Sequence, residues 1–327
     1  MRTVRSVALI LALSSACSKP APTTPITIDG SSTVYPLTQA AAELFGKSGN
    51  ATVSVAYSGT VTGFGKFCRG QLDIVNASRP ISRDEQKLCE TQGVSFVELP
   101  VAHDALTVIV NTKNTWASNI TVEELRALWH PDAERRVTRW SQVRKDWPDR
   151  EIALFGPGTE SGTFEFFNQV INGGPQLSRK DYTASGNDQV IVQGVGSSEA
   201  ALGYVGHGAF EHGRTQLKAL AVDDLNDRVG PGAIDPTPEN VQRSTYHPLS
   251  RPLLIYLNVK SAERPDVKAF VRTYVRSARD LAPAGGAVPL MGSTHKLVED
   301  RFARLSTGTI FDVPNIADAW LDLLLTQ

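Results

Sequence analysis

The residues most able to do chemistry lie in three short clusters of hydroxyl side chains and glycine. The clusters are Gly30–Thr33, Ser58–Thr60 and Ser161–Thr163. Each follows an apolar run typical of a strand and precedes a segment typical of a helix, so each presents backbone N–H groups and hydroxyls at a helix N-terminus. A single junction is weak evidence, because serine and threonine are also favoured helix caps. Three of them brought together would form a pocket for a small oxyanion, with these candidate contacts: Ser31, Ser32, Thr33, Ser58, Gly59, Thr60, Ser161, Gly162 and Thr163.

The elements around these clusters predict an α/β fold with two lobes. Short strands alternate with helices, and Ser82 followed by Glu85 predicts a capped helix start. Ligands of open α/β sheets bind beyond the carboxyl ends of the strands, where all three clusters lie. Residues 96–100 and 105–111 are predicted as two separate strands, and 105–111 and 252–257 are placed to cross between the lobes. We expect a discontinuous lobe 1 of residues 26–105 plus 258–327, and a lobe 2 of residues 106–257 that includes the crossing strands.

Composition and charge exclude several classes of function. The chain has 327 residues, 33 Lys and Arg against 34 Asp and Glu, and a net charge of −1, so no nucleic-acid partner is expected. The six histidines are scattered, and only His207 and His212 are close, at a spacing that is poor for one helix face. We therefore expect no metal and no cofactor.

The first 25 residues are typical of an export signal and a tether, and are set apart from the fold. Two arginines precede an apolar stretch that is too short to span a bilayer, and small residues lead into Cys17. Residues 1–17 thus resemble a bacterial lipoprotein signal in which Cys17 is lipidated; an ordinary secretory signal is the alternative. Residues 18–25 are rich in Pro and Thr, as flexible tethers are. A lipid anchor would place the protein in the periplasm or at the cell surface, with its body outside the bilayer.

Export would place the two remaining cysteines in an oxidising compartment. Cys68 and Cys89 form an even pair with 20 intervening residues, which predicts a disulfide. Closing such a loop stabilises the fold by about 3 kcal/mol. A reactive thiol is disfavoured, because neither cysteine has an adjacent histidine or a Cys-x-x-Cys partner.

Further motifs run through the chain in order. They are Ile28–Pro36, Ala77–Ile81, Glu98–Asp104, Ser161–Phe167, Gln193–Val195, Ala201–Tyr204 and Ser250–Tyr256. Together they resemble the phosphate-binding proteins of bacterial phosphate ABC transporters, over nearly the whole mature chain. The resemblance implies the fold of type II periplasmic binding proteins, with two lobes, a two-strand hinge and closure around the ligand. It also implies a monomeric extracytoplasmic receptor that captures inorganic phosphate and delivers it to an ABC permease, without catalysis.

The resemblance places the phosphate contacts on four loops. Those matched directly are Ser32 and Thr33 in the first, Ser58 in the second, and Ser161, Gly162 and Thr163 in the fourth, with Ser31, Gly59 and Thr60 added by proximity. The third loop departs from the best-known members, which carry an aspartate that accepts the phosphate proton; here Ser78 is followed by Arg79. The planar fork of Arg79 suits an anion, with a solvated charge or a salt bridge between lobes as alternatives. The acceptor is open among Glu160, Asp188 and Glu165, and the last also suits the first turn of a helix.

Two other functions stay open on the sequence. Ser161 could be the nucleophile of a phosphatase, but Thr159 and Thr163 stand where a nucleophile elbow needs glycine, and no base is identifiable. The fold could also serve a surface adhesin or a signalling lipoprotein that no longer binds a ligand. For Ser31 and Ser32, helix capping alone is the structural alternative.

Overall fold

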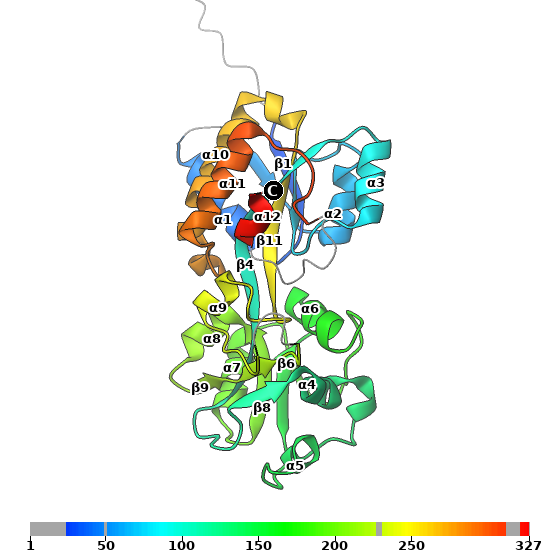
Figure 1. Cartoon of the computed structure of the whole chain (residues 1–327), viewed down its shortest axis with the longest axis vertical. Coiled ribbons are helices and arrows are strands. Elements are labelled where there is room, and N and C mark those ends of the chain that lie inside the picture. The colour runs from blue at the N-terminus through cyan, green and yellow to red at the C-terminus, as the bar shows by residue number, and fades with distance from the viewer. Residues whose placement is uncertain (1–23, 49–50, 227–230, 312–320, 327) are drawn as a thin grey trace, which may run out of the picture.

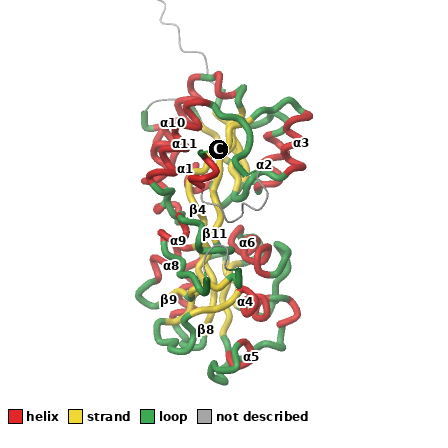
Figure 2. Tube along the Cα trace, viewed as in Figure 1, coloured by secondary structure: helices red, strands yellow, loops and turns green. Residues whose placement is uncertain are grey.

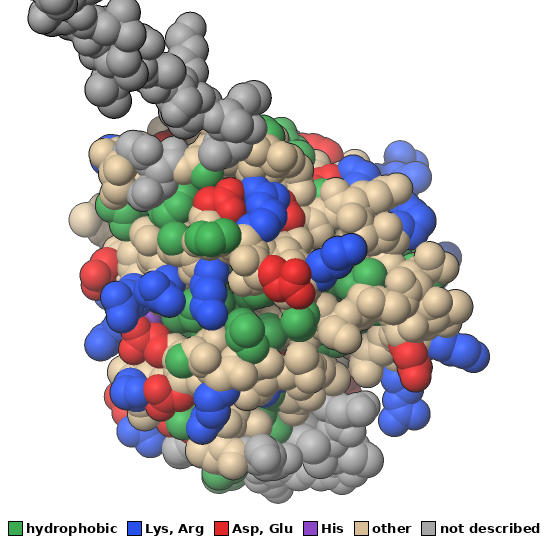
Figure 3. All heavy atoms as spheres, turned by 90° about the horizontal axis from the view of Figure 1, so that it is seen from above, with side chains coloured by type: hydrophobic (Ala, Val, Ile, Leu, Met, Phe, Trp, Pro, Cys, Tyr) green, Lys and Arg blue, Asp and Glu red, His purple; other side chains and the backbone are tan. Residues whose placement is uncertain are grey.

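The protein has two α/β lobes stacked along its long axis and joined by two long strands (Figures 1 and 2). The computed structural model describes residues 24–48, 51–226, 231–311 and 321–326. The expected signal peptide and residues 18–23 of the tether lie outside the described residues. Within the described ranges, no helix is both long and apolar enough to cross a membrane. Seen from the end of lobe 1, basic and acidic side chains are mixed over the surface (Figure 3), in keeping with the net charge of −1.

Lobe 1, the upper half of Figure 1, is built on a sheet whose strands come from distant parts of the chain. Its strand order is β2(Val53–Val55), β1(Ile26–Gly30), β3(Ile74–Ala77), β11(Ser250–Asn258) and β4(Phe96–Asn111). The first three are parallel, as strand–helix–strand units require, whereas β11 runs antiparallel to both of its neighbours. The parallel strands therefore end at one edge of the sheet, where the first three predicted loops begin.

Helices cover both faces of this sheet. They are α1(Tyr35–Gly46), α2(Thr60–Phe67), α3(Arg83–Thr91), α10(Pro265–Leu281), α11(Gly292–Arg304) and α12(Leu321–Leu325), with the short turns η2(Ser261–Glu263) and η3(Pro283–Gly285). On one face α1 and α10 pack through Phe45 and Phe270, whose ring centroids lie 5.5 Å apart. On the other face Cys68 caps the C-terminus of α2 and Cys89 lies in α3, and the structure confirms the predicted disulfide between them.

Alternate residues of β11 separate the two cores of lobe 1. Leu253, Ile255 and Leu257 pack with α1 and α10, whereas Leu254 and Tyr256 pack with the residues of α2 and α3. Successive side chains of a strand point to opposite faces, so a strand buried on both sides is apolar throughout. This is why the segment 252–257 could be recognised as a strand without an alternating pattern.

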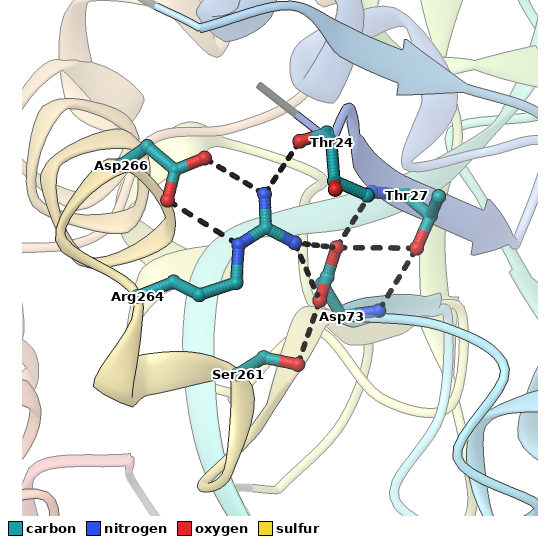
Figure 4. A network of polar contacts seen from close by, with 6 residues as sticks. All are labelled: Thr24, Thr27, Asp73, Ser261, Arg264 and Asp266. Atoms are coloured by element: carbon teal, nitrogen blue, oxygen red, sulfur yellow. Dashed lines mark hydrogen bonds and ion pairs between the residues drawn. The ribbon is translucent and has the colours of Figure 1, made fainter. Parts of the chain in front are cut away.

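An arginine network ties the start of the chain to the segment that returns from lobe 2 (Figure 4). Arg264 Nη2 donates to the backbone oxygen of Thr24 at 2.6 Å, and Nη1 lies 3.3 Å from Asp73 Oδ2. Asp73 also accepts the backbone N–H of Thr27 at 2.9 Å and the hydroxyl of Ser261 at 2.7 Å. Residues from the two ends of the chain thus form one lobe, which makes lobe 1 discontinuous. The exact bounds of both lobes stay a prediction.

Lobe 2, the lower half of Figure 1, continues the same sheet. Beyond β4 lie β8(Ala201–Gly206), β6(Ala153–Pro157) and β7(Thr183–Ser185), with β9(Leu217–Ala219) paired to β4 and a separate pair of β5(Asn119–Thr121) and β10(Ala221–Asp223). Its helices are α4(Val122–Trp129), α5(Trp140–Val143), α6(Gly162–Ile171), α7(Asp188–Gly196), α8(His207–Gly213) and α9(Pro238–Gln242), with the turn η1(Pro131–Ala133). Phe167 of α6 stacks on Tyr204 of β8 with centroids 3.9 Å apart. This stacking holds α6, and the loop at its N-terminus, against the sheet.

The hinge differs from the sequence prediction in one respect. Residues 96–100 and 105–111 are not two strands but parts of one strand, β4, whose 16 residues are all buried. The pairing of β4 with β11 shifts between Leu253 and Leu254, which face Ala102 and Pro100 and leave Val101 without a direct partner. Such a bulge accommodates proline, which has no N–H to give to a ladder. Both β4 and β11 run from lobe 1 into lobe 2 (Figure 2).

Candidate functional site

A cavity of about 260 Å³ lies between the lobes and is lined by residues of both. Its polar side chains are those of Ser32, Thr33, Asp104, Ser161, Thr163 and Asp188, and its glycines are Gly162, Gly206, Gly208, Gly285 and Gly286. The structure thus brings together the first and fourth predicted loops, although they belong to different lobes.

The first loop leaves β1 through a glycine that no other residue can replace. Gly30 has a φ of 133°, and a β-carbon there would lie 2.1 Å from the backbone oxygen of Asn76. The next residue, Ser31, is buried; its N–H donates to that same oxygen at 2.9 Å, and its hydroxyl accepts the N–H of Thr33 at 3.2 Å. Ser31 therefore shapes the turn, whereas Ser32 and Thr33 line the cavity.

The fourth loop forms the N-terminus of α6. Ser161 is the N-cap residue, and its hydroxyl accepts the N–H of Thr163 at 3.2 Å. Gly162 lies against the first loop, since a β-carbon there would be 2.9 Å from Thr33 Oγ1 and 3.5 Å from Ser32 Oγ. The N-terminus of a ten-residue helix and the hydroxyls of the opposite lobe therefore face one cavity, as an anion site requires.

The second and third loops adjoin the first loop but do not line the cavity. The N–H of Gly59 donates to the backbone oxygen of Gly30 at 2.8 Å, and Thr60 Oγ1 lies 3.4 Å from Ser78 Oγ. Ser58 donates to Asp29 Oδ2 at 2.9 Å. Contact of Ser58, Gly59, Thr60 and Ser78 with a ligand stays a prediction.

Asp29 is the carboxylate around which these loops are organised. Burial alone would raise its pKa, but hydrogen bonds from Lys66, Gly30 and Ser58, together with the charge of Lys66, hold the pKa below its usual value. Lys66 Nζ lies 2.5 Å from Asp29 Oδ2. Asp29 is thus an ionised structural anchor that fixes the first two loops to each other.

Arg79, in the loop after β3, is engaged with the helix that follows, α3. Its Nη1 and Nη2 atoms donate to the two carboxylate oxygens of Glu85 at 2.8 Å each, and Glu85 also closes the predicted capping box with Ser82. The guanidinium carbon lies 5.8 Å from the ring centroid of Phe64. In this arrangement Arg79 does not line the cavity, and its contact with an anion stays a prediction that requires it to leave Glu85.

Asp104, which lines the cavity, and its partner Arg251 were not assigned from the sequence. They are cross-strand neighbours on β4 and β11. Arg251 Nε and Nη2 lie 3.0 and 2.9 Å from Asp104 Oδ2, and Nη2 also donates to Thr33 Oγ1 at 3.3 Å. Asp104 ends the motif Glu98–Asp104, and Arg251 is the second residue of the motif Ser250–Tyr256. A charged residue next to a buried apolar run is unusual, and this could have indicated both residues from the sequence.

The three carboxylates considered as proton acceptors are placed differently. Asp188 lines the cavity at the first position of α7, and the loss of surrounding water raises the pKa of its carboxyl. Glu165 is exposed in the first turn of α6 and does not line the cavity. Glu160 also lies outside the lining, with its carboxylate over Gly158 and Gly186. Of the three, Asp188 alone reaches the cleft.

Known proteins resemble the chain over most of its length. The profile of the PBP superfamily domain matches residues 17–277. Protein SphX of Synechocystis is 41% identical over 328 residues, covering 100% of this chain and 96% of that protein. The phosphate-binding protein PstS of Staphylococcus haemolyticus is 30% identical over 272 residues, covering 82% of each chain. The crystal structure of a possible phosphate-binding protein from Planctomyces limnophilus has a TM-score of 0.79 at 40% identity, over 88% of this chain and 100% of that one.

These matches agree with the fold and with the place of the cleft. The two lobes, the two-strand hinge and the discontinuous first lobe are those predicted for a type II periplasmic binding protein. The matched profile spans the first, second, third and fourth loops and both hinge strands. The chain therefore belongs to the PBP superfamily and, within it, to the family of phosphate-binding proteins that includes PstS.

Proposed function

We propose that the protein is an extracytoplasmic receptor that captures inorganic phosphate between its lobes and delivers it to the permease of an ABC importer. The observation that carries the proposal is the meeting of the first and fourth loops across one cavity. It is supported by the similarity to PstS, which is itself a phosphate-binding protein.

The chemistry of the cleft suits a small oxyanion. Hydroxyls of Ser32, Thr33, Ser161 and Thr163 line it, and the N-terminus of α6 adds backbone N–H groups and the positive end of its dipole. Because donors come from both lobes, one anion can contact both at once only when the lobes are close. Ligand binding therefore shifts the population towards the closed arrangement.

We propose binding without catalysis. Ser161 Oγ accepts the N–H of Thr163, and within the described ranges no histidine, aspartate or glutamate forms a hydrogen bond with it. A serine nucleophile needs such a base. The proposal extends to a monomeric protein whose Cys17 carries the lipid anchor, in keeping with the sequence of the leader.

Calorimetric titration of the protein with phosphate tests this function. We expect binding by the wild type and a loss of about tenfold or more in Ser161→Ala, because one hydrogen bond to a charged group is removed. Ser54→Ala, an exposed position on β2, is the matched control and should bind as the wild type does. Thermal unfolding without phosphate separates this loss from the loss of the helix cap.

The alternatives give different results in the same samples. If the wild type binds no phosphate, the result favours an adhesin or a signalling lipoprotein that has kept the fold. Hydrolysis of a chromogenic phosphate ester that disappears in Ser161→Ala would assign the cleft to a phosphatase.

A further inference from the structure

A phosphate receptor needs a hydrogen-bond acceptor as well as donors. This step rests on the proposed function. At neutral pH phosphate keeps at least one proton, whereas sulfate keeps none, so a carboxylate in the site favours phosphate and repels sulfate. Ser78 stands where the aspartate of the best-known relatives is expected, but a hydroxyl can turn and donate to either anion. Selection against sulfate therefore calls for a carboxylate elsewhere in the cleft.

We propose that Asp104 is this acceptor and that Arg251 is the residue that positions it. Asp104 is 8% exposed and lines the cavity together with Thr33 and Ser161. Arg251 contacts a single carboxylate oxygen, Oδ2, through both Nε and Nη2. No described residue donates to the other oxygen, Oδ1. That oxygen is left to accept the proton-bearing hydroxyl of a bound phosphate, and the proton stays on the phosphate.

Arg251 is held by both lobes, which fixes the direction of the carboxylate. Its Nη2 donates to Thr33 Oγ1 in the first loop, and its guanidinium carbon lies 4.1 Å from the ring centroid of Phe166 on α6. A planar guanidinium that pairs and stacks at once has little freedom to turn. The ion pair is also neutral as a unit, so its net charge repels neither anion strongly; discrimination arises at Oδ1, which can accept a phosphate hydroxyl but faces only lone pairs of a sulfate oxygen.

Asp188, the other carboxylate of the cavity, lacks these features. It is exposed at the first position of α7, and no lysine or arginine of the described ranges forms an ion pair with it. A carboxylate without a neutralising partner repels a phosphate dianion as well as a sulfate. Asp188 therefore lacks the partner that would offset this repulsion and fix the direction of its carboxylate.

The test titrates the intact protein with phosphate, sulfate and monofluorophosphate at pH 7.5. Monofluorophosphate has the shape of phosphate but carries fluorine in place of the hydroxyl, so it offers no proton. The variants are Asp104→Asn and Asp188→Asn, with Asp149→Asn as the matched control. Asp149 also pairs with an arginine, Arg139 at 2.5 Å, but lies outside the cavity.

We expect the wild type to prefer phosphate over both other anions. Asp104→Asn should weaken phosphate binding about 10- to 100-fold and reduce the preference over sulfate and monofluorophosphate by at least tenfold. Asp149→Asn should leave all three affinities unchanged. Asp104→Glu, which keeps a carboxylate, should lose phosphate affinity but retain the rejection of sulfate.

Other outcomes overturn the assignment of Asp104, and one of them also overturns the proposed function. An unchanged preference in Asp104→Asn, or a reduced preference in Asp188→Asn alone, removes Asp104 as the acceptor and leaves phosphate reception intact. Tight binding of monofluorophosphate by the wild type does the same without any variant, so the test survives a variant that fails to fold. A wild type that binds no phosphate removes the proposed function, and this inference with it.

Discussion

Gly162, at the start of α6, lies against the hydroxyl of Thr33 in the opposite lobe: a β-carbon at Gly162 would come within 2.9 Å of Thr33 Oγ1. Thr33 Oγ1 is in turn held by Arg251 Nη2 at 3.3 Å. The lobes therefore meet beside the anion cleft through a glycine, and a side chain at this position would fit only if Thr33 shifted.

Gly162→Ala should weaken phosphate binding by about tenfold, because the added methyl group displaces Thr33 and holds the two loops apart. The helix itself should not suffer, since alanine is the better helix former. Calorimetry measures the affinity, and thermal unfolding without ligand measures the stability. Gly46→Ala is the matched control, because nothing lies within 4 Å of a β-carbon at that end of α1. Equal affinities in the two variants would show that the lobes have room to adjust.

Arg79 of the third loop and Arg251 of β11 should differ in their effect on phosphate binding. Lysine keeps the charge but lacks the planar guanidinium, whose separate nitrogens hold one partner or two in a fixed geometry. Arg251→Lys should therefore weaken binding about tenfold, since it releases Asp104 and Thr33, whereas Arg79→Lys should change it less than about threefold. Titration of both variants with phosphate measures the difference. A larger loss in Arg79→Lys would mean that Arg79 leaves Glu85 to bind the anion.

Reduction of the disulfide should lower the free energy of unfolding by about 3 kcal/mol, because Cys68 and Cys89 are 21 positions apart and close a loop in the unfolded chain. Urea unfolding with and without a reductant measures the change. The control is a Cys68→Ala, Cys89→Ala double variant, which should be less stable and insensitive to reductant. The expectation is contradicted if the free energy of unfolding of the wild type does not change although a thiol assay shows that the disulfide has been reduced.

His103 should make part of the stability sensitive to acid. Its ring is buried on β4, and burial lowers its pKa from 6.5 to about 4. Because the pKa is lower in the folded state, the unfolded chain takes up a proton at His103 first as the pH falls. The free energy of unfolding is therefore unaffected by His103 above pH 6.5 and decreases as the pH falls from 6.5 towards 4. Between pH 7 and pH 4 the wild type should lose about 3 kcal/mol more unfolding free energy than His103→Gln.

Urea unfolding at both pH values checks this difference. His212→Gln, at an exposed position of α8, is the control and should follow the wild type. The expectation fails if His103→Gln loses as much stability on acidification as the wild type does.

Local pattern was enough to predict much of the fold. The capping box of Ser82 and Glu85 and the strand–turn–helix junctions are each completed within a few residues. The crossing strands contain continuous apolar runs, and the disulfide joins the two cysteines that remain after Cys17. Prediction failed at 96–111, where two strands were expected and the structure has one, β4, which continues through the bulge at Val101.

The residues that line the cavity could not be predicted from the sequence, because they depend on how the lobes meet and on the register between β4 and β11. Ser58 and Ser78 end strands of the same sheet as Ser32, but which of them faces the opposite lobe is decided by how the lobes meet. Asp104 and Arg251 pair because of the register between β4 and β11, and an unseen bulge changes that register by one residue.

The paired strands β4 and β11 also have a mechanical consequence. Their paired stretch runs from Phe96 and Asn258 to Ala105 and Ser250 and is interrupted by the bulge at Val101, and β4 then continues into lobe 2, where it pairs with β8. Separation of the lobes must therefore bend this ribbon. The work of flexing is the same whichever anion is captured. Stiffening the ribbon would therefore change the affinity for every ligand by one common factor, while the ranking of the ligands is set by the cleft alone.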